Sequence, residues 1–305
     1  MKIIVTGSNS QLALCIKDIV EESKIETKDD EYLFFPHSIL DITNIDNIRL
    51  IVNKYQPDVI INCAAYTDVD KANEDICSCE EANVDGPKNL AIVCNEKNIN
   101  LIHISSDYVY EDFEKRIPRT EEFPTLPEQE YGASKLFGED EIKKYIDPEK
   151  TNYIIIRTSW LYSIYKKNFM KTMVNLINDD KIKEIPVVND QIGRPTCAHD
   201  LASFIVNDII SNRNLDKYGT YNFQNSGDEC SWYDFALEIN KKIDDNIKIL
   251  PIFTKDYISS KTNYSIVRPK YSVMNLTKIK NAFNSVPNNW KNALYKELNR
   301  IFNKL

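Results

Sequence analysis

Short apolar strands alternate with helices over the first half of the chain, and this alternation constrains the fold more than any other feature of the sequence. Five runs have the β-branched or continuously apolar character of buried strands, at residues 2–6, 32–35, 57–62, 100–105 and 152–158. The segments between them repeat apolar residues at helical spacing, as at Leu12, Ile16 and Ile19. Strands joined by helices in this order predict an α/β fold with a doubly wound parallel sheet.

The turn after the first strand indicates where a dinucleotide could bind. Residues 2–6 end at Gly7 and a helix opens soon after, so its N-terminus would face a pyrophosphate. The glycine fingerprint of Rossmann-type domains is reduced, because Ser10 and Ala13 stand at its second and third positions. On this stretch alone an ordinary βα turn fits equally well. No acid follows the second strand, at Pro36-His37-Ser38, which favours NADP over NAD.

The pattern loosens beyond Trp160, which indicates a second lobe. One helix is predicted before this point, at 76–97. Beyond it, helices are predicted at 169–177, 199–210, 231–242 and 290–302. Strands are predicted at 184–188 and 218–223, and a loop at 190–196. A chain of 305 residues is long enough for two domains. We expect a dinucleotide-binding domain formed by residues 1–158 and about 196–222. The smaller C-terminal substrate-binding lobe would comprise about 159–195 and 223–305.

The composition disfavours several classes of partner. A net charge of −8 argues against nucleic acid and anionic membrane surfaces. No run approaches the roughly 18 apolar residues of a membrane span, and the chain starts directly in a strand, without a signal peptide. The seven cysteines are scattered and lack paired zinc-ligand spacing. We therefore expect reduced thiols, a cytoplasmic protein and no metal site.

A tyrosine and a lysine four residues apart are the leading candidates for catalytic residues. Such a pair is poor evidence by itself, because the sequence holds three, Tyr131/Lys135, Tyr162/Lys166 and Tyr257/Lys261. Only Tyr131 follows a core strand that ends in hydroxyls, at Ser105-Ser106, and begins a convincing helix. Context therefore selects the Tyr131/Lys135 pair.

The spacing of this pair suits a reduction site. Residues four apart share one helix face, so the ammonium of Lys135 is expected to lower the pKa of the Tyr131 phenol from about 10 toward neutrality. A phenol tuned in this way can transfer a proton to a substrate oxygen. The Ser106 hydroxyl could hydrogen-bond the same oxygen.

Eight segments carry a resemblance to a known family. These family-like segments are residues 6–12, 62–72, 105–110, 157–162, 168–173, 190–196, 231–236 and 268–272, and the Tyr131/Lys135 pair lies between the third and the fourth. Together they resemble the dTDP-4-dehydrorhamnose reductases, which belong to the extended short-chain dehydrogenase/reductases. The resemblance covers nearly the whole chain.

The resemblance implies an activity. A member of this family would use NADPH, with NADH as the alternative, to reduce the 4-keto group of dTDP-4-dehydro-6-deoxy-L-mannose to dTDP-L-rhamnose, for surface polysaccharide. Tyr131 would be the proton donor, and Lys135 would hold the nicotinamide ribose. Ser106 stands where the family usually has threonine. A homodimer is possible.

The resemblance also assigns binding residues. The cofactor side would comprise Gly7, Ser10, Gln11, Leu12, Asp41, Ile42, Ala64, Ala65, Tyr66 and Lys135. The sugar pocket would be lined by Val69, Ser106, Tyr108, Tyr131 and Trp160. Charge and family placement suggest contacts to the nucleotide diphosphate from Asn168, Lys171, Arg194 and Arg268.

Departures from the family pattern leave two alternatives. The loss of glycines around Gly7 favours a non-catalytic regulatory subunit that keeps the fold, whereas the Ser106, Tyr131 and Lys135 set argues against it. A nucleotide-sugar epimerase or dehydratase is the other alternative, although Asp107 offers one acid beside Ser106 and no clear second. Cys15 stands at a first-helix position where some members carry a glutamate that contributes to a magnesium-linked dimer, so that metal is not predicted.

Overall fold

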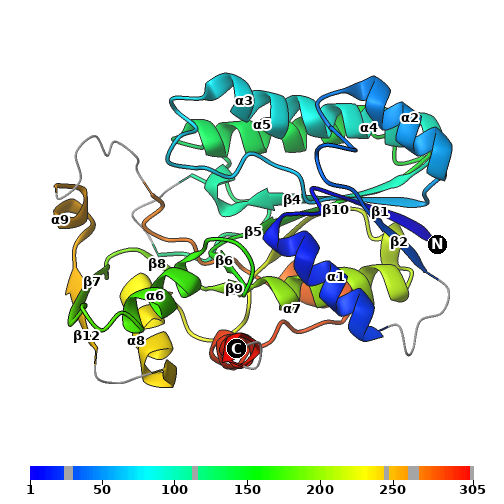
Figure 1. Cartoon of the computed structure of the whole chain (residues 1–305). Coiled ribbons are helices and arrows are strands. Elements are labelled where there is room, and N and C mark those ends of the chain that lie inside the picture. The colour runs from blue at the N-terminus through cyan, green and yellow to red at the C-terminus, as the bar shows by residue number, and fades with distance from the viewer. Residues whose placement is uncertain (24–29, 112–115, 244–246, 260–267, 303–305) are drawn as a thin grey trace.

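A six-stranded parallel sheet forms the centre of the molecule (Figure 1). The computed structural model describes residues 1–23, 30–111, 116–243, 247–259 and 268–302. The strand order is β10-β5-β4-β3-β1-β2. The strands are β1 (Lys2–Thr6), β2 (Glu31–Phe34), β3 (Val59–Asn62), β4 (Asn100–Ser106), β5 (Tyr153–Thr158) and β10 (Gly219–Phe223). The predicted α/β fold with a parallel, doubly wound sheet is confirmed.

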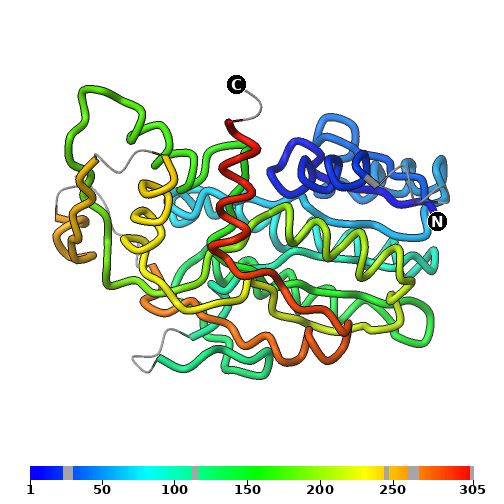
Figure 2. The backbone as a smooth tube through the Cα atoms, turned by 90° about the horizontal axis from the view of Figure 1, so that it is seen from below, coloured from blue at the N-terminus to red at the C-terminus, as the bar shows by residue number. Residues whose placement is uncertain are grey.

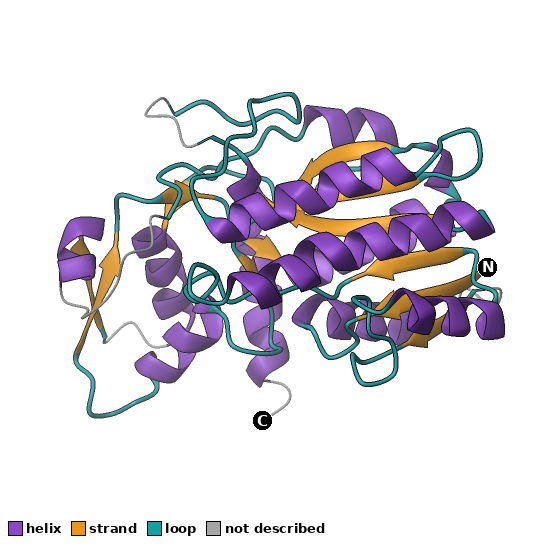
Figure 3. Cartoon of the chain, turned by 90° about the horizontal axis from the view of Figure 1, so that it is seen from above, coloured by secondary structure: helices purple, strands orange, loops and turns teal. Residues whose placement is uncertain are grey.

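Helices cover both faces of this sheet (Figures 1 and 3). One face carries α2 (Ile45–Tyr55), α4 (Gly86–Lys97) and α5 (Glu130–Tyr145). The other carries α1 (Gln11–Ser23) and α7 (Ala198–Ser203), which continues as the π-helical η3 (Phe204–Ser211). Successive strand residues point to opposite faces, so Ile3 and Val5 enter one apolar core and Ile4 enters the other. Burial on both faces explains the continuously apolar strands.

The strand order reverses direction between β1 and β3, and this reversal places the candidate site. β1 lies between β2 and β3, so the segments that leave β1 and β3 separate at their carboxyl ends. Open parallel sheets bind ligands at such a point. Gly7 leaves β1 with a φ of 57°, and a Cβ there would lie 2.7 Å from the Ala64 backbone nitrogen. Only glycine fits this close approach without strain.

A third apolar core lies beside the sheet domain, under α6 (Phe169–Ile177), α8 (Trp232–Ile243) and the parallel pair β7 (Glu184–Val188) and β12 (Lys248–Ile252). The short helix α9 (Thr254–Ser259) follows β12. The C-terminal helix α11 (Trp290–Phe302) lies between this lobe and the sheet domain (Figure 2). The exact division into two domains stays a prediction.

The shorter elements show where sequence patterns were too weak. The helix predicted over 76–97 forms as α3 (Ile76–Glu80), the π-helical η1 (Glu81–Asp85) and α4. The predicted loop at 190–196 is wrong in part, since it contains β8 (Ile192–Gly193) and leads into β9 (Thr196–Cys197). These pair with β11 (Cys230–Ser231) and β6 (Leu161–Tyr162), respectively. The remaining elements are α10 (Thr277–Phe283) and the 3-10 turns η2 (Asp107–Val109) and η4 (Asn214–Asp216). Within the described ranges, no helix has the length and apolar character to cross a membrane.

Candidate active site

A cleft of about 760 Å³ opens at the carboxyl end of the sheet, between it and the second lobe. Its volume falls in the range of ligand pockets, about 300–1,000 Å³. Many residues singled out from the sequence line it, namely Ser10, Gln11, Leu12, Ala64, Ala65, Val69, Ser106, Tyr108, Tyr131, Lys135, Trp160, Asn168 and Arg268. Six others lie outside its wall: Gly7, Asp41, Ile42, Tyr66, Lys171 and Arg194.

Two hydroxyls meet where β4 ends and α5 begins. Ser106 is the last residue of β4, and its Oγ accepts a hydrogen bond from the Tyr108 backbone N–H at 3.2 Å and donates to Asp107 Oδ1 at 3.2 Å. The Tyr131 ring packs edge-on against Tyr108, with centroids 5.4 Å apart. Burial raises the pKa of Tyr131 to about 12, although a hydrogen bond with Ser106 opposes the shift. The phenol is therefore protonated at neutral pH.

Close packing fixes α5 and hence Tyr131. A Cβ at Gly132 would collide with the Tyr108 carbonyl oxygen, and one at Gly138 would collide with the Asn83 carbonyl oxygen. Two glycines therefore let the helix approach its neighbours closely. Farther along, Glu139 accepts hydrogen bonds from Arg157 of β5, which ties α5 to the sheet.

Lys135 is buried, and its amine bonds to the backbone of β4. Its Nζ donates to the Ile104 carbonyl oxygen at 2.7 Å and lies 3.4 Å from His103 Nε2. Burial lowers the pKa of Lys135 to about 8. The prediction that Lys135 lowers the pKa of Tyr131 is therefore wrong in this structure, because burial of the phenol dominates.

A chain of buried hydrogen bonds next to Lys135 orients His103. Asn62 Oδ1 accepts from the Thr6 hydroxyl at 2.6 Å, which turns the Asn62 amide nitrogen toward His103 Nδ1 at 3.1 Å. Since Nδ1 accepts this hydrogen bond, Nε2 carries the proton of the neutral ring. Burial and the Lys135 charge hold the pKa of His103 well below its ordinary value, so the ring is neutral.

The opposite wall of the cleft is aromatic. Trp160 of the β5–β6 segment stacks on Trp232 of α8, with centroids 3.6 Å apart, and Phe169 lies 4.6 Å from Trp232. Both Trp232 and Phe169 line the cleft and were missed as site residues, although both fall in family-like segments. Two adjacent lysines, Lys166 and Lys167, also line it and were missed, and they give this wall a positive charge.

The residues predicted to contact a diphosphate differ in their contacts with the rest of the protein. Asn168 caps α6 by accepting from the Lys171 backbone N–H at 3.1 Å, and its amide donates to the Ser163 carbonyl at 2.7 Å. Arg268 forms an ion pair with Asp70 at the cleft. Arg194 is partly buried, with Nη1 3.5 Å from the Met274 carbonyl oxygen.

Three further residues predicted on the cofactor side, Asp41, Ile42 and Tyr66, lie outside the cleft wall. Asp41 Oδ1 accepts from the Thr43 hydroxyl and backbone N–H, which forms the turn before α2. Ile42 is buried in the apolar core on the sheet face that α2, α4 and α5 cover. The Tyr66 backbone N–H donates to Asn83 at 2.9 Å. Lys261 of the third Tyr-x-x-x-Lys pair lies outside the described residues.

The doubly wound sheet, the glycine turn at Gly7 and the cluster of Ser106, Tyr131 and Lys135 define a short-chain dehydrogenase/reductase type of oxidoreductase. More narrowly, the chain belongs to the RmlD family. The family model described as "RmlD substrate binding domain" matches residues 1–302.

Individual relatives agree with this assignment, three of them over nearly the full length. A dTDP-4-dehydrorhamnose reductase of Aggregatibacter actinomycetemcomitans is 36% identical over 96% of this chain and 97% of its own. The crystal structure of one from Clostridium acetobutylicum matches with a TM-score of 0.88 at 35% identity, covering 99% and 100% of the two chains. One from Bacillus anthracis, in complex with NADP, gives 0.86 at 32%, covering 98% and 99%. A dTDP-4-keto-6-deoxy-D-glucose reductase of Streptomyces niveus is 35% identical over 65% of each chain.

Proposed function

We propose that this protein uses NADPH to reduce the 4-keto group of dTDP-4-dehydro-6-deoxy-L-mannose, with dTDP-L-rhamnose as product. The observation that carries the proposal is the pair of hydroxyls of Ser106 and Tyr131 on the cleft wall, beside the buried amine of Lys135. The family relationship and the named relatives support the substrate class.

The residues around Gly7 fit a dinucleotide. A Cβ at Gly7 would fill the space against Ala64, and the first residues of α1 line the cleft at Ser10, Gln11 and Leu12. The helix N-terminus there favours a pyrophosphate. The NADP-bound relative from Bacillus anthracis supports NADPH, and NADH is an alternative. When bound, this cofactor supplies the hydride.

Tyr131 holds the proton that the reaction needs. Its pKa of about 12 keeps the phenol protonated, so it can protonate the alkoxide that forms at the substrate oxygen. Ser106 would donate a hydrogen bond to the same oxygen and stabilise its developing charge. Lys135 in its protonated form would position the ribose and restore the Tyr131 proton. A positioned general acid contributes about 10²–10⁴-fold to such a rate.

The cleft between the sheet domain and the second lobe would bind the nucleotide sugar. Val69, Tyr108 and Trp160 line the cleft and would contact the sugar. Asn168 and Arg268 line it as well and would contact the diphosphate, and the same role is proposed for Lys171 and Arg194, which lie outside the cleft wall. Because dTDP-sugars are dianions at the diphosphate, the positive wall favours this class despite the net negative charge of the chain.

NADPH oxidation tests the proposal with three substrates, dTDP-4-keto-6-deoxy-L-mannose, its diastereomer dTDP-4-keto-6-deoxy-D-glucose and the UDP analogue. The first should have the highest kcat/KM. A higher value for the D-gluco compound would assign another dTDP-sugar. Tyr131→Phe should lower kcat by at least about 10²-fold with NADPH affinity unchanged. Tyr145→Phe, on the far turn of the same helix, is the matched control and should keep the rate. Full activity of Tyr131→Phe would refute the assigned proton donor.

A further inference from the structure

The indole of Trp160 is enclosed between two segments that are distant in the sequence. Trp232, the first residue of α8, stacks on it with ring centroids 3.6 Å apart and an interplanar angle of 12°. A Cβ built at Gly193 of β8 would lie 2.7 and 2.8 Å from Cε2 and Cζ2 of the same indole. Two rings at stacking distance leave no room for an atom between them, so Gly193 covers the other side of the ring.

The pairing of two short strands places these neighbours around the indole. β8 and β11 are antiparallel, with Gly193 opposite Cys230. Trp232 follows β11 directly, so the strand pair holds the glycine and the second indole close together. Gly193 does not have a positive φ. The close approach of the Trp160 ring, and not the backbone conformation, therefore requires glycine at this position.

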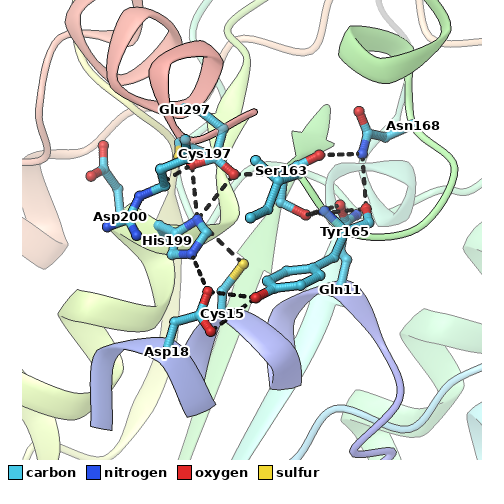
Figure 4. Close-up of polar contacts among 12 residues, drawn as sticks. Gln11, Cys15, Asp18, Ser163, Tyr165, Asn168, Cys197, His199, Asp200 and Glu297 are labelled. Carbon is cyan, nitrogen blue, oxygen red and sulfur yellow. Dashed lines mark hydrogen bonds and ion pairs between the residues drawn. The ribbon is translucent and has the colours of Figure 1, made fainter. Parts of the chain in front are cut away.

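The backbone of Trp160 is held in an unusual conformation. Its φ of 48° lies in the left-handed region, which residues with a side chain rarely occupy. Its carbonyl oxygen accepts a hydrogen bond from the Thr196 backbone N–H at 3.1 Å. The segment that follows is tied to α1, because the Ser163 hydroxyl donates to Gln11 at 3.1 Å (Figure 4). Such a conformation persists only where the surroundings hold it, and it is common at ligand sites.

The two indoles differ in their polar contacts. The Trp232 N–H donates to Gln191 Oε1 at 3.2 Å, and the Gln191 amide donates to the Thr254 hydroxyl at 3.1 Å, which fixes this ring. The Trp160 N–H is not buried and has no acceptor among the residues that the structure describes. Trp160, which lines the cleft, therefore keeps a hydrogen-bond donor for a ligand.

We propose that Gly193 and Trp232 are positioning residues, which hold the Trp160 indole so that its edge contacts the sugar of the bound nucleotide sugar. Both faces of the ring are covered, so a ligand cannot stack on it and reaches the edge alone. A ring that is fixed before the ligand arrives loses little freedom on binding, which favours affinity. This inference rests on the proposed function, because the ligand class comes from there.

Circular dichroism tests the geometry without any turnover. Stacked indoles couple and give two far-ultraviolet bands of opposite sign, whereas the third tryptophan, Trp290, meets a phenylalanine edge-on. Trp232→Leu should abolish these bands, and Gly193→Ala should weaken them, since the new Cβ displaces the Trp160 ring. Ile192→Val is the matched control, because it changes the same strand but packs in a separate apolar cluster. Bands of full strength in Gly193→Ala would overturn the proposal.

Kinetics then test the contact with the sugar. Gly193→Ala should raise KM for the keto sugar by about 10–100-fold, as expected for one lost pocket contact, with kcat and NADPH affinity nearly unchanged. In a Trp160→Leu background, which leaves room for the new Cβ, the same substitution should raise KM no further.

Equal increases of KM in the two backgrounds would overturn the proposal, because Gly193 would then act on another group. Failure of the proposed function gives a different result. In that case the wild type would reduce none of the keto sugars, while the circular dichroism of Gly193→Ala would still decide whether this glycine positions the indole.

Discussion

The ion pair between Glu139 and Arg157 should dominate the stability of α5, the helix that carries Tyr131. Arg157 Nε and Nη2 donate to the two carboxylate oxygens at 2.8 and 2.6 Å, and the Ser105 hydroxyl donates at 2.6 Å. The two side chains are 0% and 3% exposed. Burial opposes ionisation of Glu139, but its hydrogen bonds and charge pairing with Arg157 hold its pKa below the ordinary value.

Glu139→Gln keeps the shape of the side chain and removes its charge, so Arg157 remains buried without a counter-charge. Breaking a buried pair in this way costs about 3–5 kcal/mol. We expect the low end, about 3 kcal/mol, because the amide oxygen can still accept one hydrogen bond. At about 2–4 °C per kcal/mol, the midpoint of thermal unfolding should fall by roughly 6–12 °C.

Denaturant unfolding followed by circular dichroism measures this change. The control is Glu184→Gln, which breaks the Lys248 pair at a similar 2.9 Å but with side chains 52% and 66% exposed, and should cost less than about 1 kcal/mol. The difference between wild type and Glu139→Gln should shrink as pH falls through the depressed pKa of Glu139, because stability from a lowered carboxyl pKa is lost on protonation. A cost within about 1 kcal/mol of wild type would refute the reasoning.

Three further predictions concern the cleft. Gly7→Ala should weaken NADPH binding measured by fluorescence titration, since the new Cβ meets Ala64 at 2.7 Å and φ is 57°; unchanged affinity would contradict a cofactor at this turn. The rate should decline as pH rises through about 8, where Lys135 loses its proton, and a flat profile up to pH 10 would exclude a role for the ammonium. Gly132→Ala should lower kcat even where the protein stays folded, because the new Cβ forces Tyr131 and its helix away from Tyr108.

Much of the architecture could be read from the sequence, because long periodic elements carry a strong signal. The runs at 100–105 and 152–158 became β4 and β5, and the helix that starts near Tyr131 became α5. Two-residue strands such as β8 and β9 have no period to detect, so 190–196 was predicted as a loop. Their pairing depends on partners far along the chain.

The chemistry of the site was harder to predict than the identity of the residues that line it. Spacing placed Tyr131 and Lys135 on one helix, but it could not show that the Lys135 amine bonds to Ile104. Trp232 was missed because its stacking on Trp160 joins separate segments. The buried contact between Cys15 and His199 could not be predicted either, since the two residues lie 184 positions apart and no local spacing reveals it.

Deuterium transfer tests the central claim most directly. NADPH deuterated at the transferable position of the nicotinamide would be incubated with the protein and dTDP-4-keto-6-deoxy-L-mannose, and the product examined by proton NMR. Reduction at the proposed site predicts deuterium at C4 of the sugar and a product identical to dTDP-L-rhamnose. Recovery of unlabelled keto sugar with intact NADPH would contradict the proposed activity.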